Sequence, residues 1–167
     1  MTNLRKAVFF DRDGVINKER KDYVKTVSEL EIFPNIVISI KKLIKMGFLI
    51  VVITNQSAIN RGFTTHQDVF DIHSRIQEFL QKNDTRIDNF YYCPHKPDEH
   101  CDCRKPNPGL ILRAACELKI DLQKSWMIGD NETDVEAAIK SGCKYFKINS
   151  NDELPFIVDK ILDEDIL

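Results

Sequence analysis

The 167-residue sequence has no excess of basic residues. Its 24 lysines and arginines face 26 aspartates and glutamates, which leaves a formal net charge of −2. This balance lacks the electrostatic footprint of a protein that binds nucleic acid or a charged membrane surface. We therefore expect a small-molecule partner, no nucleic-acid partner and no membrane partner, and we expect the protein to be a monomer.

Long hydrophobic runs are also missing. The longest, residues 48–53, is six residues, whereas a membrane-spanning helix needs about 20. The apolar stretch at residues 7–10 is too short for the hydrophobic region of a signal peptide. There are no repeats or low-complexity tracts, and 43% of the residues are hydrophobic. The length and composition predict a single domain over residues 1–167 with a hydrophobic core, in a cytoplasmic protein.

Short apolar runs alternate with helical patterns along the whole chain. Residues 6–10, 48–53, 87–92, 126–128 and 145–148 are expected to form strands. Pro34 and Pro108 stand where helices can begin, Thr64 or Thr65 can cap a third helix, and residues 133–141 and the acidic C-terminal segment predict two more. Alternation of this kind predicts a doubly wound, Rossmann-like α/β fold with a mostly parallel sheet.

Polar residues follow four of these strands, and ligands of such folds collect beyond the carboxyl ends of the strands. Singly, each group has an ordinary explanation as a turn, a helix cap or a surface pair. Their convergence on one edge of one sheet favours a functional site. The candidates are Asp11, Asp13, Thr54, Asn55, Gln56, Ser57, Arg104, Lys105 and Asp130.

This set of side chains suits the transfer of a phosphoryl group to a carboxylate, because cations and hydrogen-bond donors must neutralise two negatively charged reactants. Asp11 is the candidate nucleophile, forming an aspartyl-phosphate, and Asp13 the candidate general acid and base. Thr54 and Lys105 would stabilise the transferring phosphoryl group. Catalytic Mg²⁺ would be held by Asp11, by the carbonyl of Asp13 and by Asp130.

Three of the five cysteines fall within eleven residues, and an odd total argues against a fully paired disulfide set. Cys93, His95, Cys101 and Cys103 could give Zn²⁺ a closed tetrahedral shell, which indicates a structural ion, with His100 as a competing ligand. Zinc would supply folding energy that a loop without an apolar core lacks. Cys116 and Cys143 are expected to be small core residues.

Four segments together resemble a known family. FFDRDGVIN, VVITNQSAINRG, CPHKPDEHCDCRKPNPG and MIGDNETDVEAA are similar, in order, to the motifs of the haloacid-dehalogenase superfamily of phosphatases. Within it, the chain resembles the subfamily of D-glycero-D-manno-heptose 1,7-bisphosphate 7-phosphatases and histidinol-phosphate phosphatases, which have a similar zinc loop. The resemblance implies the same roles for Asp11, Asp13, Thr54 and Lys105, and substrate recognition by Arg104.

The spacing of the motifs leaves no room for a cap domain, so specificity should come from the loops at residues 17–24, 55–63 and 93–105. Residues 55–62, with Asn55, Gln56 and Ser57 as candidate substrate ligands, resemble the heptose enzymes more than the histidinol enzymes. Histidinol phosphate remains an alternative substrate. A phosphoacceptor signalling domain, in which Asp11 would keep its phosphate, is an alternative of another class.

Overall fold

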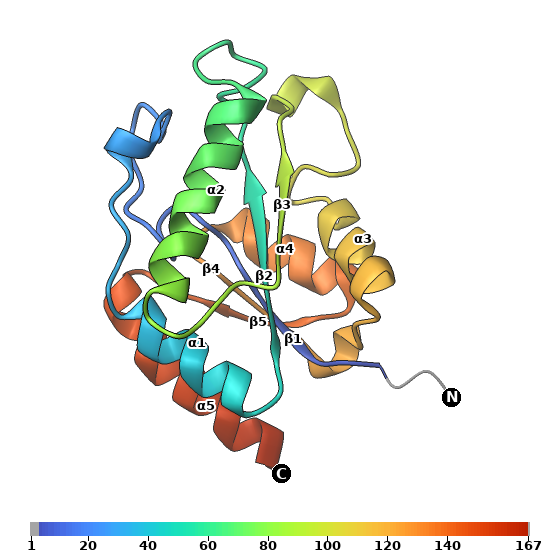
Figure 1. Cartoon of the computed structure of the whole chain (residues 1–167). Helices are drawn as coiled ribbons and strands as arrows, with labels where there is room; N and C mark the ends of the chain where they lie inside the picture. The colour runs from blue at the N-terminus through green and yellow to red at the C-terminus, as the bar shows by residue number, and fades with distance from the viewer. Residues whose placement is uncertain (1–3, 167) are drawn as a thin grey trace.

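The computed structural model describes residues 4–166 and contains a five-stranded sheet in which every neighbouring pair of strands is parallel. The spatial order is β3-β2-β1-β4-β5 (Figure 1). The strands are β1 Ala7–Phe10, β2 Leu49–Asn55, β3 Asn89–Cys93, β4 Trp126–Gly129 and β5 Lys144–Lys147. The predicted doubly wound α/β fold is confirmed, and each predicted strand is present with its ends shifted by at most two residues.

Helices cover both faces of the sheet. They are α1 Ile36–Lys45, α2 His66–Gln81, α3 Gly109–Leu118, α4 Glu132–Ser141 and α5 Leu154–Ile166, and short 3₁₀ turns occupy some of the loops. Thr65 caps α2 through a capping box with Asp68, and Gly142 ends α4 in the left-handed conformation, at φ +83°. These are the caps that the sequence predicts.

Two hydrophobic layers fix the sheet between the helices. On one face, Val8 and Phe10 pack with α1, α2 and α5, and on the other Ala7 and Phe9 pack with α3 and α4. Alternation along β1 thus sends successive side chains to opposite layers. Because β1 is completely buried on both faces, the loop that follows it starts from a rigid position.

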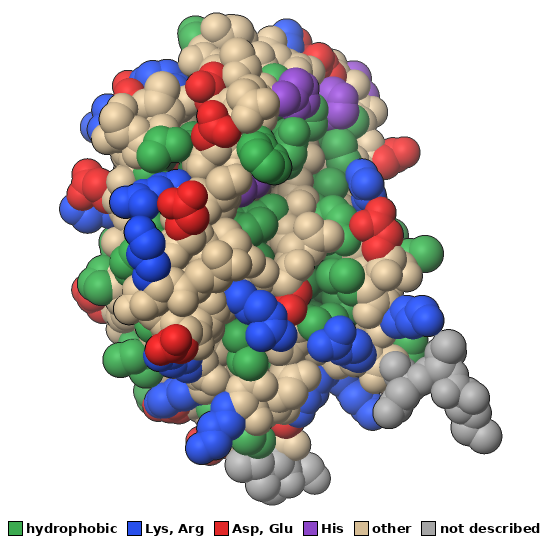
Figure 2. Space-filling model, in the orientation of Figure 1, with side chains coloured by type: hydrophobic (Ala, Val, Ile, Leu, Met, Phe, Trp, Pro, Cys, Tyr) green, Lys and Arg blue, Asp and Glu red, His purple; other side chains and the backbone are tan. Residues whose placement is uncertain are grey.

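The strand order reverses beside β1, between its neighbours β2 and β4, and a crevice forms at such a point in an open α/β sheet. Figure 1 shows the loops after β1, β2 and β3 rising together at the carboxyl ends of the strands. On the face seen in Figure 2, lysines and arginines are interspersed with acidic side chains. Among the described residues, no helix is long and apolar enough to cross a membrane.

Candidate active site

A cavity of about 340 Å³ opens at the reversal point. Eight of the predicted site residues line it, namely Asp11, Asp13, Thr54, Asn55, Gln56, Ser57, Arg104 and Lys105. Asp130, at the end of β4, is not in its wall. An Asp130 carboxylate oxygen nevertheless lies within 4.8 Å of one on Asp11. The structure therefore gathers the polar ends of four strands in one place, as the sequence predicts.

Asp11 begins the loop after β1 and is 8% exposed. Its backbone N–H donates to Ile128 at 3.0 Å, which continues the pairing of β1 with β4. Its Oδ1 accepts from the backbone N–H of Arg12 at 2.7 Å and lies 2.9 Å from the Lys105 Nζ. Both contacts involve the same oxygen, so within the described chain Oδ2 is the oxygen left to face the cavity.

Lys105 brings a buried positive charge to this carboxylate. Its Nζ donates to the carbonyl of Ile53 at 2.8 Å and lies 2.6 Å from the Asp134 carboxylate. The Asn55 side chain clamps its backbone from both sides, donating to the Lys105 carbonyl at 3.0 Å and accepting from its N–H at 3.1 Å. Asp134 thus joins Lys105 to the loop after β4, because its other carboxylate oxygen accepts from the backbone N–H of Asn131 at 3.0 Å.

Burial raises the pKa of Asp11 to about 7, against the opposing effect of Lys105 and with help from the charges of Asp134 and Asp13. Burial also opposes the charge on Lys105, but Asp11 and Asp134 outweigh it and raise the pKa of the ammonium. The site thus keeps its lysine charged. It holds more negative charge than this one cation balances, and a further cation would stabilise ionised Asp11.

Asp13 is held by a set of donors that leaves its carboxylate little freedom. Arg12 Nη2 contacts Oδ1 at 2.9 Å, Asn17 Nδ2 donates to Oδ1 at 2.9 Å, and Gln56 Nε2 donates to Oδ2 at 2.9 Å. Burial favours the neutral acid, but the Arg12 charge and these hydrogen bonds outweigh it and lower the pKa of Asp13. Asp13 is therefore an ionised, oriented carboxylate in the free protein.

Arg12 is completely buried, although arginine is among the side chains least often found inside a protein. Its Nη1 lies 3.5 Å from the Nε2 of His73, whose ring stacks on Phe90 at 4.6 Å between centroids. Burial, together with the nearby Arg12 charge, lowers the pKa of His73 to about 3, so this imidazole is neutral. The sequence of α2 alone does not reveal this burial, because the arginine opposite His73 comes from the loop after β1.

Thr54 and Gln56 act as a pair. Gln56 Nε2 also donates to the Thr54 hydroxyl at 2.8 Å, and both residues are almost completely buried. Since the hydroxyl oxygen accepts from Gln56, its own hydrogen is free to donate to an anion in the cavity. The amide of Gln56 is engaged by Asp13 and Thr54, which indicates a positioning role beside the predicted contact with substrate.

Gly14 makes room for the carboxylate of Asp130. Its φ is +86°, which a side chain rarely tolerates, and a methyl group at this position would come within 2.0 Å of Asp130 Oδ2. The side-chain amide of Asn131 donates to the other Asp130 oxygen at 2.8 Å. Asp11, Asp130 and Asp134 each place a carboxylate oxygen within 4.8 Å of the others. Hard oxygen donors at this spacing fit Mg²⁺.

The four predicted zinc ligands also come together. Cys93 Sγ lies 3.3 Å from His95 Nδ1, 3.5 Å from Cys101 Sγ and 3.0 Å from Cys103 Sγ. A tetrahedral ion with bonds of about 2.3 Å to sulfur would separate its ligands by only slightly more than these distances. Burial raises the pKa of the Cys93 thiol, so its thiolate needs a cation. His100 is exposed and outside this set.

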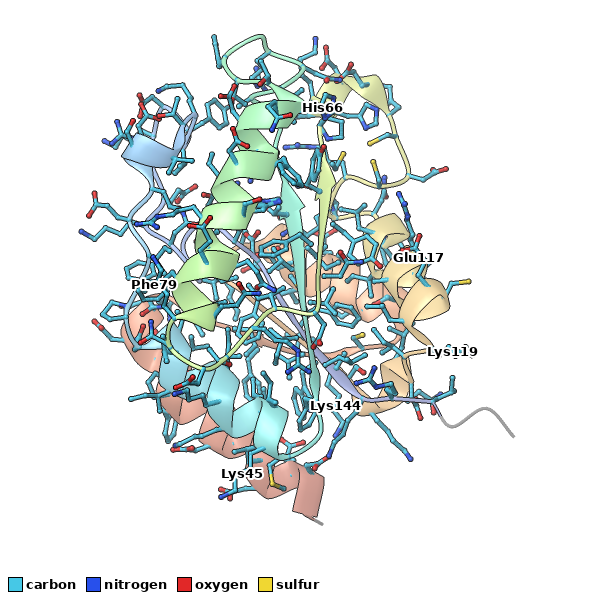
Figure 3. The ribbon with its side chains drawn as sticks, viewed as in Figure 1. Lys45, His66, Phe79, Glu117, Lys119 and Lys144 are labelled. Atoms are coloured by element: carbon cyan, nitrogen blue, oxygen red, sulfur yellow. The ribbon has the colours of Figure 1, made fainter. Side chains whose placement is uncertain are left out.

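The other two cysteines differ from each other. Cys143 is buried in the layer under α3 and α4, as predicted, whereas Cys116 is exposed on α3. The prediction for Cys116 was wrong because α3 turns a wider polar face to solvent than its apolar pattern indicated. Figure 3 places His66 at the start of α2, near the point where β3 leads into the loop at residues 93–105, called the cysteine loop below. The His66 Nδ1 lies 2.8 Å from the Tyr92 hydroxyl.

The guanidinium of Arg104 joins the cysteine cluster to the cavity. Its Nη1 donates to the backbone carbonyl of His95 at 3.0 Å, and its side chain lines the cavity. A predicted zinc ligand therefore orients the residue predicted to recognise substrate. Residue 105, next in the chain, is the lysine that pairs with Asp11.

Comparison with known proteins gives a consistent set of relatives. A model of HAD-hydrolase-like proteins matches residues 102–153. A D-glycero-β-D-manno-heptose-1,7-bisphosphate 7-phosphatase from Helicobacter pylori is 43% identical over 143 residues, 85% of this chain and 82% of the relative. An enzyme of the same name from Pseudomonas putida is 39% identical, over 83% of this chain and 79% of the relative. The crystal structure of D,D-heptose 1,7-bisphosphate phosphatase from B. bronchiseptica, complexed with magnesium and phosphate, is similar at a TM-score of 0.88 and 28% identity, covering 95% of this chain and 99% of that one.

Proposed function

The chain belongs to the haloacid-dehalogenase phosphatases related to the heptose-1,7-bisphosphate 7-phosphatases, and we propose that it hydrolyses the 7-phosphate of D-glycero-D-manno-heptose 1,7-bisphosphate. The observation that carries the proposal is the buried Asp11 carboxylate, which lines the cavity and has its Oδ1 held by Lys105. We propose that residues 1–167 act as one capless domain. The terminal positions 1–3 and 167 lie outside the described residues.

In the first step, Asp11 Oδ2 attacks the phosphorus and the bond to the leaving oxygen breaks, which forms an aspartyl-phosphate. Thr54 donates its hydroxyl hydrogen to a phosphoryl oxygen, and the Lys105 ammonium balances the charge of the transferring group. Because both side chains are buried and anchored, little reorganisation is needed when the phosphate arrives.

Asp13 moves the proton in both steps. A bound phosphate adds negative charge beside its carboxylate, which raises its affinity for a proton above that of the free protein. Asp13 then donates this proton to the leaving oxygen. In the second step it accepts a proton from the water that attacks the phosphorus and releases Asp11. The contacts from Arg12 and Gln56 keep the carboxylate in place throughout.

Two metal ions fit the residues present. Asp11, the carbonyl of Asp13 and Asp130 would hold Mg²⁺, with Asp134 already paired to Lys105. When bound, Mg²⁺ supplies positive charge that offsets the repulsion between carboxylate and phosphate. Cys93, His95, Cys101 and Cys103 would hold structural Zn²⁺, and through His95 and residue 104 fix the far side of the cavity.

The substrate proposal rests on the relatives together with the cationic side of the cavity. Arg104 would pair with the second phosphate, while Asn55, Gln56 and Ser57 border the phosphate to be cleaved. We also propose that the enzyme acts as a monomer, and that it works in the cytoplasm, where the cluster of thiols would stay reduced.

The test is phosphate release from a panel containing the heptose 1,7-bisphosphate, histidinol phosphate, other sugar phosphates and acetyl phosphate, each with and without Mg²⁺. We expect the heptose bisphosphate to have the highest kcat/KM. Asp11→Asn should lower the rate by several orders of magnitude, because it removes the nucleophilic charge at constant size. Full activity of Asp11→Asn would overturn the mechanism. A phosphoenzyme that forms but does not turn over would favour the signalling alternative.

A further inference from the structure

Two neighbouring aromatic side chains, one of which lines the cavity, take no part in the steps above. Tyr23 lines the cavity. Its ring centroid is 6.0 Å from that of Phe63, with the planes inclined by 36°. Phe63 belongs to the loop after β2 and is 57% exposed. A single exposed aromatic residue is ordinary on a protein surface, so the position of Tyr23 needs separate evidence.

The backbone of Tyr23 supplies that evidence. Its φ is +68°, in the left-handed region, which costs a residue with a side chain about 1–2 kcal/mol. Of the non-glycine residues with positive φ in the described chain, it alone lines the cavity. Lys119 and His100 end helical segments, where this conformation is common. Tyr23 ends no helix, and its conformation directs an aromatic ring to the cavity.

Hydrogen bonds hold the loops that carry the two rings. The Thr64 hydroxyl, next to Phe63 in the chain, donates to the carbonyl of Lys25 at 2.8 Å. On the opposite side of the same loop, Asn60 donates to the Glu99 carboxylate at 3.0 and 3.1 Å. The loop after β2 thus connects the loop after β1 to the cysteine loop, so the aromatic pair is part of a braced rim.

We propose that Tyr23 and Phe63 form an aromatic lip that packs against the C–H face of the sugar and makes the site selective for polyol phosphates. The inference rests on the proposed function and names the part of the same site that recognises the carbon chain. An aromatic ring carries partial negative charge on its face, which attracts the weakly positive C–H groups of a sugar. The floor of the cavity is polar and charged, so it cannot provide such a surface.

The test measures binding in the Asp11→Asn background with Mg²⁺, so that no turnover is required. Calorimetry compares the β-anomer of D-glycero-D-manno-heptose 1,7-bisphosphate with inorganic phosphate, which cannot reach the lip. Tyr23→Leu and Phe63→Leu should each weaken binding of the bisphosphate by about 5- to 30-fold. Binding of inorganic phosphate should weaken by less than about twofold. Tyr23→Phe, which keeps the ring, should stay within about threefold of the parent.

Phe156→Leu is the matched control, since Phe156 is 61% exposed on α5 and does not line the cavity. Thermal melting checks folding, and if Tyr23→Leu is unstable, Phe63→Leu alone decides. Equal losses for both ligands, or unchanged bisphosphate affinity, would overturn the lip. Bisphosphate binding that depends on the lip, without turnover by the wild type, would overturn the proposed function and leave the lip intact.

Discussion

The catalytic floor, formed by Asp11, Asp13 and Thr54 in the cavity wall and by Asp130 beside them, differs from the cysteine loop at residues 93–105 in how it is built. The floor residues lie at or just after the ends of strands that are buried in the sheet, so the hydrophobic core fixes their positions. Every residue from 94 to 104 is exposed or half-buried, and four ligand atoms come together there instead of a core. Packing of the sheet is enough to build the floor, whereas the proposed zinc ion would hold the loop together.

Lys105 belongs to both regions. Its backbone ends the cysteine loop, while its ammonium lies in the floor with Asp11 and Asp134. Asn55 at the end of β2 clamps that backbone in place. A change that disorders the loop should therefore also lower catalysis at the floor. The loss should be partial, because Asn55 and the carbonyl of Ile53 still hold Lys105. The following predictions test this division between the two regions.

The largest effect is expected within the floor. Asp13→Asn keeps the size of the side chain but removes proton transfer, and should lower kcat by about 10²- to 10⁴-fold. The loss should be greater for a sugar phosphate than for acetyl phosphate, whose leaving group needs little protonation. Rates of phosphate release from both substrates check this, with Asp71→Asn on the exposed face of α2 as the control. An equal loss for the two substrates would count against Asp13 as the general acid.

A smaller effect is expected from the loop. Cys103→Ser should remove zinc, lower the melting temperature and reduce kcat/KM by about 10- to 100-fold, because the loop loses its folding energy while Lys105 keeps its clamp. Metal analysis should find one zinc per chain in the wild type. Cys116→Ser, a solvent-exposed cysteine on α3, is the matched control. A chelated protein that regains full activity and stability with magnesium alone would contradict a structural zinc.

The connection between the regions is tested at Arg104. Arg104→Ala should lower kcat/KM for the heptose bisphosphate by about tenfold or more, and much less for a monophosphate, since only the bisphosphate offers a second anion to the guanidinium. Arg86→Ala, an exposed arginine paired with Asp88 away from the cavity, is the control. If kcat/KM falls equally for the bisphosphate and the monophosphate, Arg104 does not recognise the second phosphate, and its bond to the His95 carbonyl serves only to shape the loop.

The smallest effect on catalysis is expected from the buried support behind the floor, where the predicted loss is one of stability. His73 has a pKa of about 3 in the folded protein, so below about pH 6.5 the unfolded chain binds a proton that the folded chain does not. Stability should fall as the pH drops from about 6.5 toward 3, by up to about 1.4 kcal/mol per pH unit from this group. Urea unfolding between pH 7 and pH 4 should show a shallower loss for His73→Gln. If the free energy of unfolding falls equally steeply with pH in the wild type and in His73→Gln, groups other than His73 govern the acid sensitivity.

The sequence predicts the floor well because its residues lie at or just after the ends of strands, and parallel strands must end at one edge. Asp11, Thr54 and Asp130 could be placed in this way without coordinates. The cysteine cluster could be predicted for a different reason, since its ligands are close in the chain. Neither the position of strand ends nor closeness in the chain predicts the environment of Arg12, because its buried neighbour His73 is 61 positions away on α2.

The same limit applies to the side chains that were assigned to substrate. The sequence places Asn55 and Gln56 at the cavity, but which way an amide points depends on partners from other segments. Asn55 faces residue 105, and Gln56 faces Asp13 and Thr54. The aromatic pair was missed too, because a left-handed tyrosine has no local sequence signature.

The strand order has a consequence for how the protein folds as it is synthesised. β1 is made first, yet it lies between β2 and β4, and β4 leaves the ribosome only after most of the chain. Until then one edge of a fully apolar strand is uncovered, and contacts between distant segments form slowly because a long loop must close first. Asp11, the proposed nucleophile, thus has its complete surroundings only when the last third of the chain has joined the sheet, so a truncated chain would have the Asp11 motif without a working site.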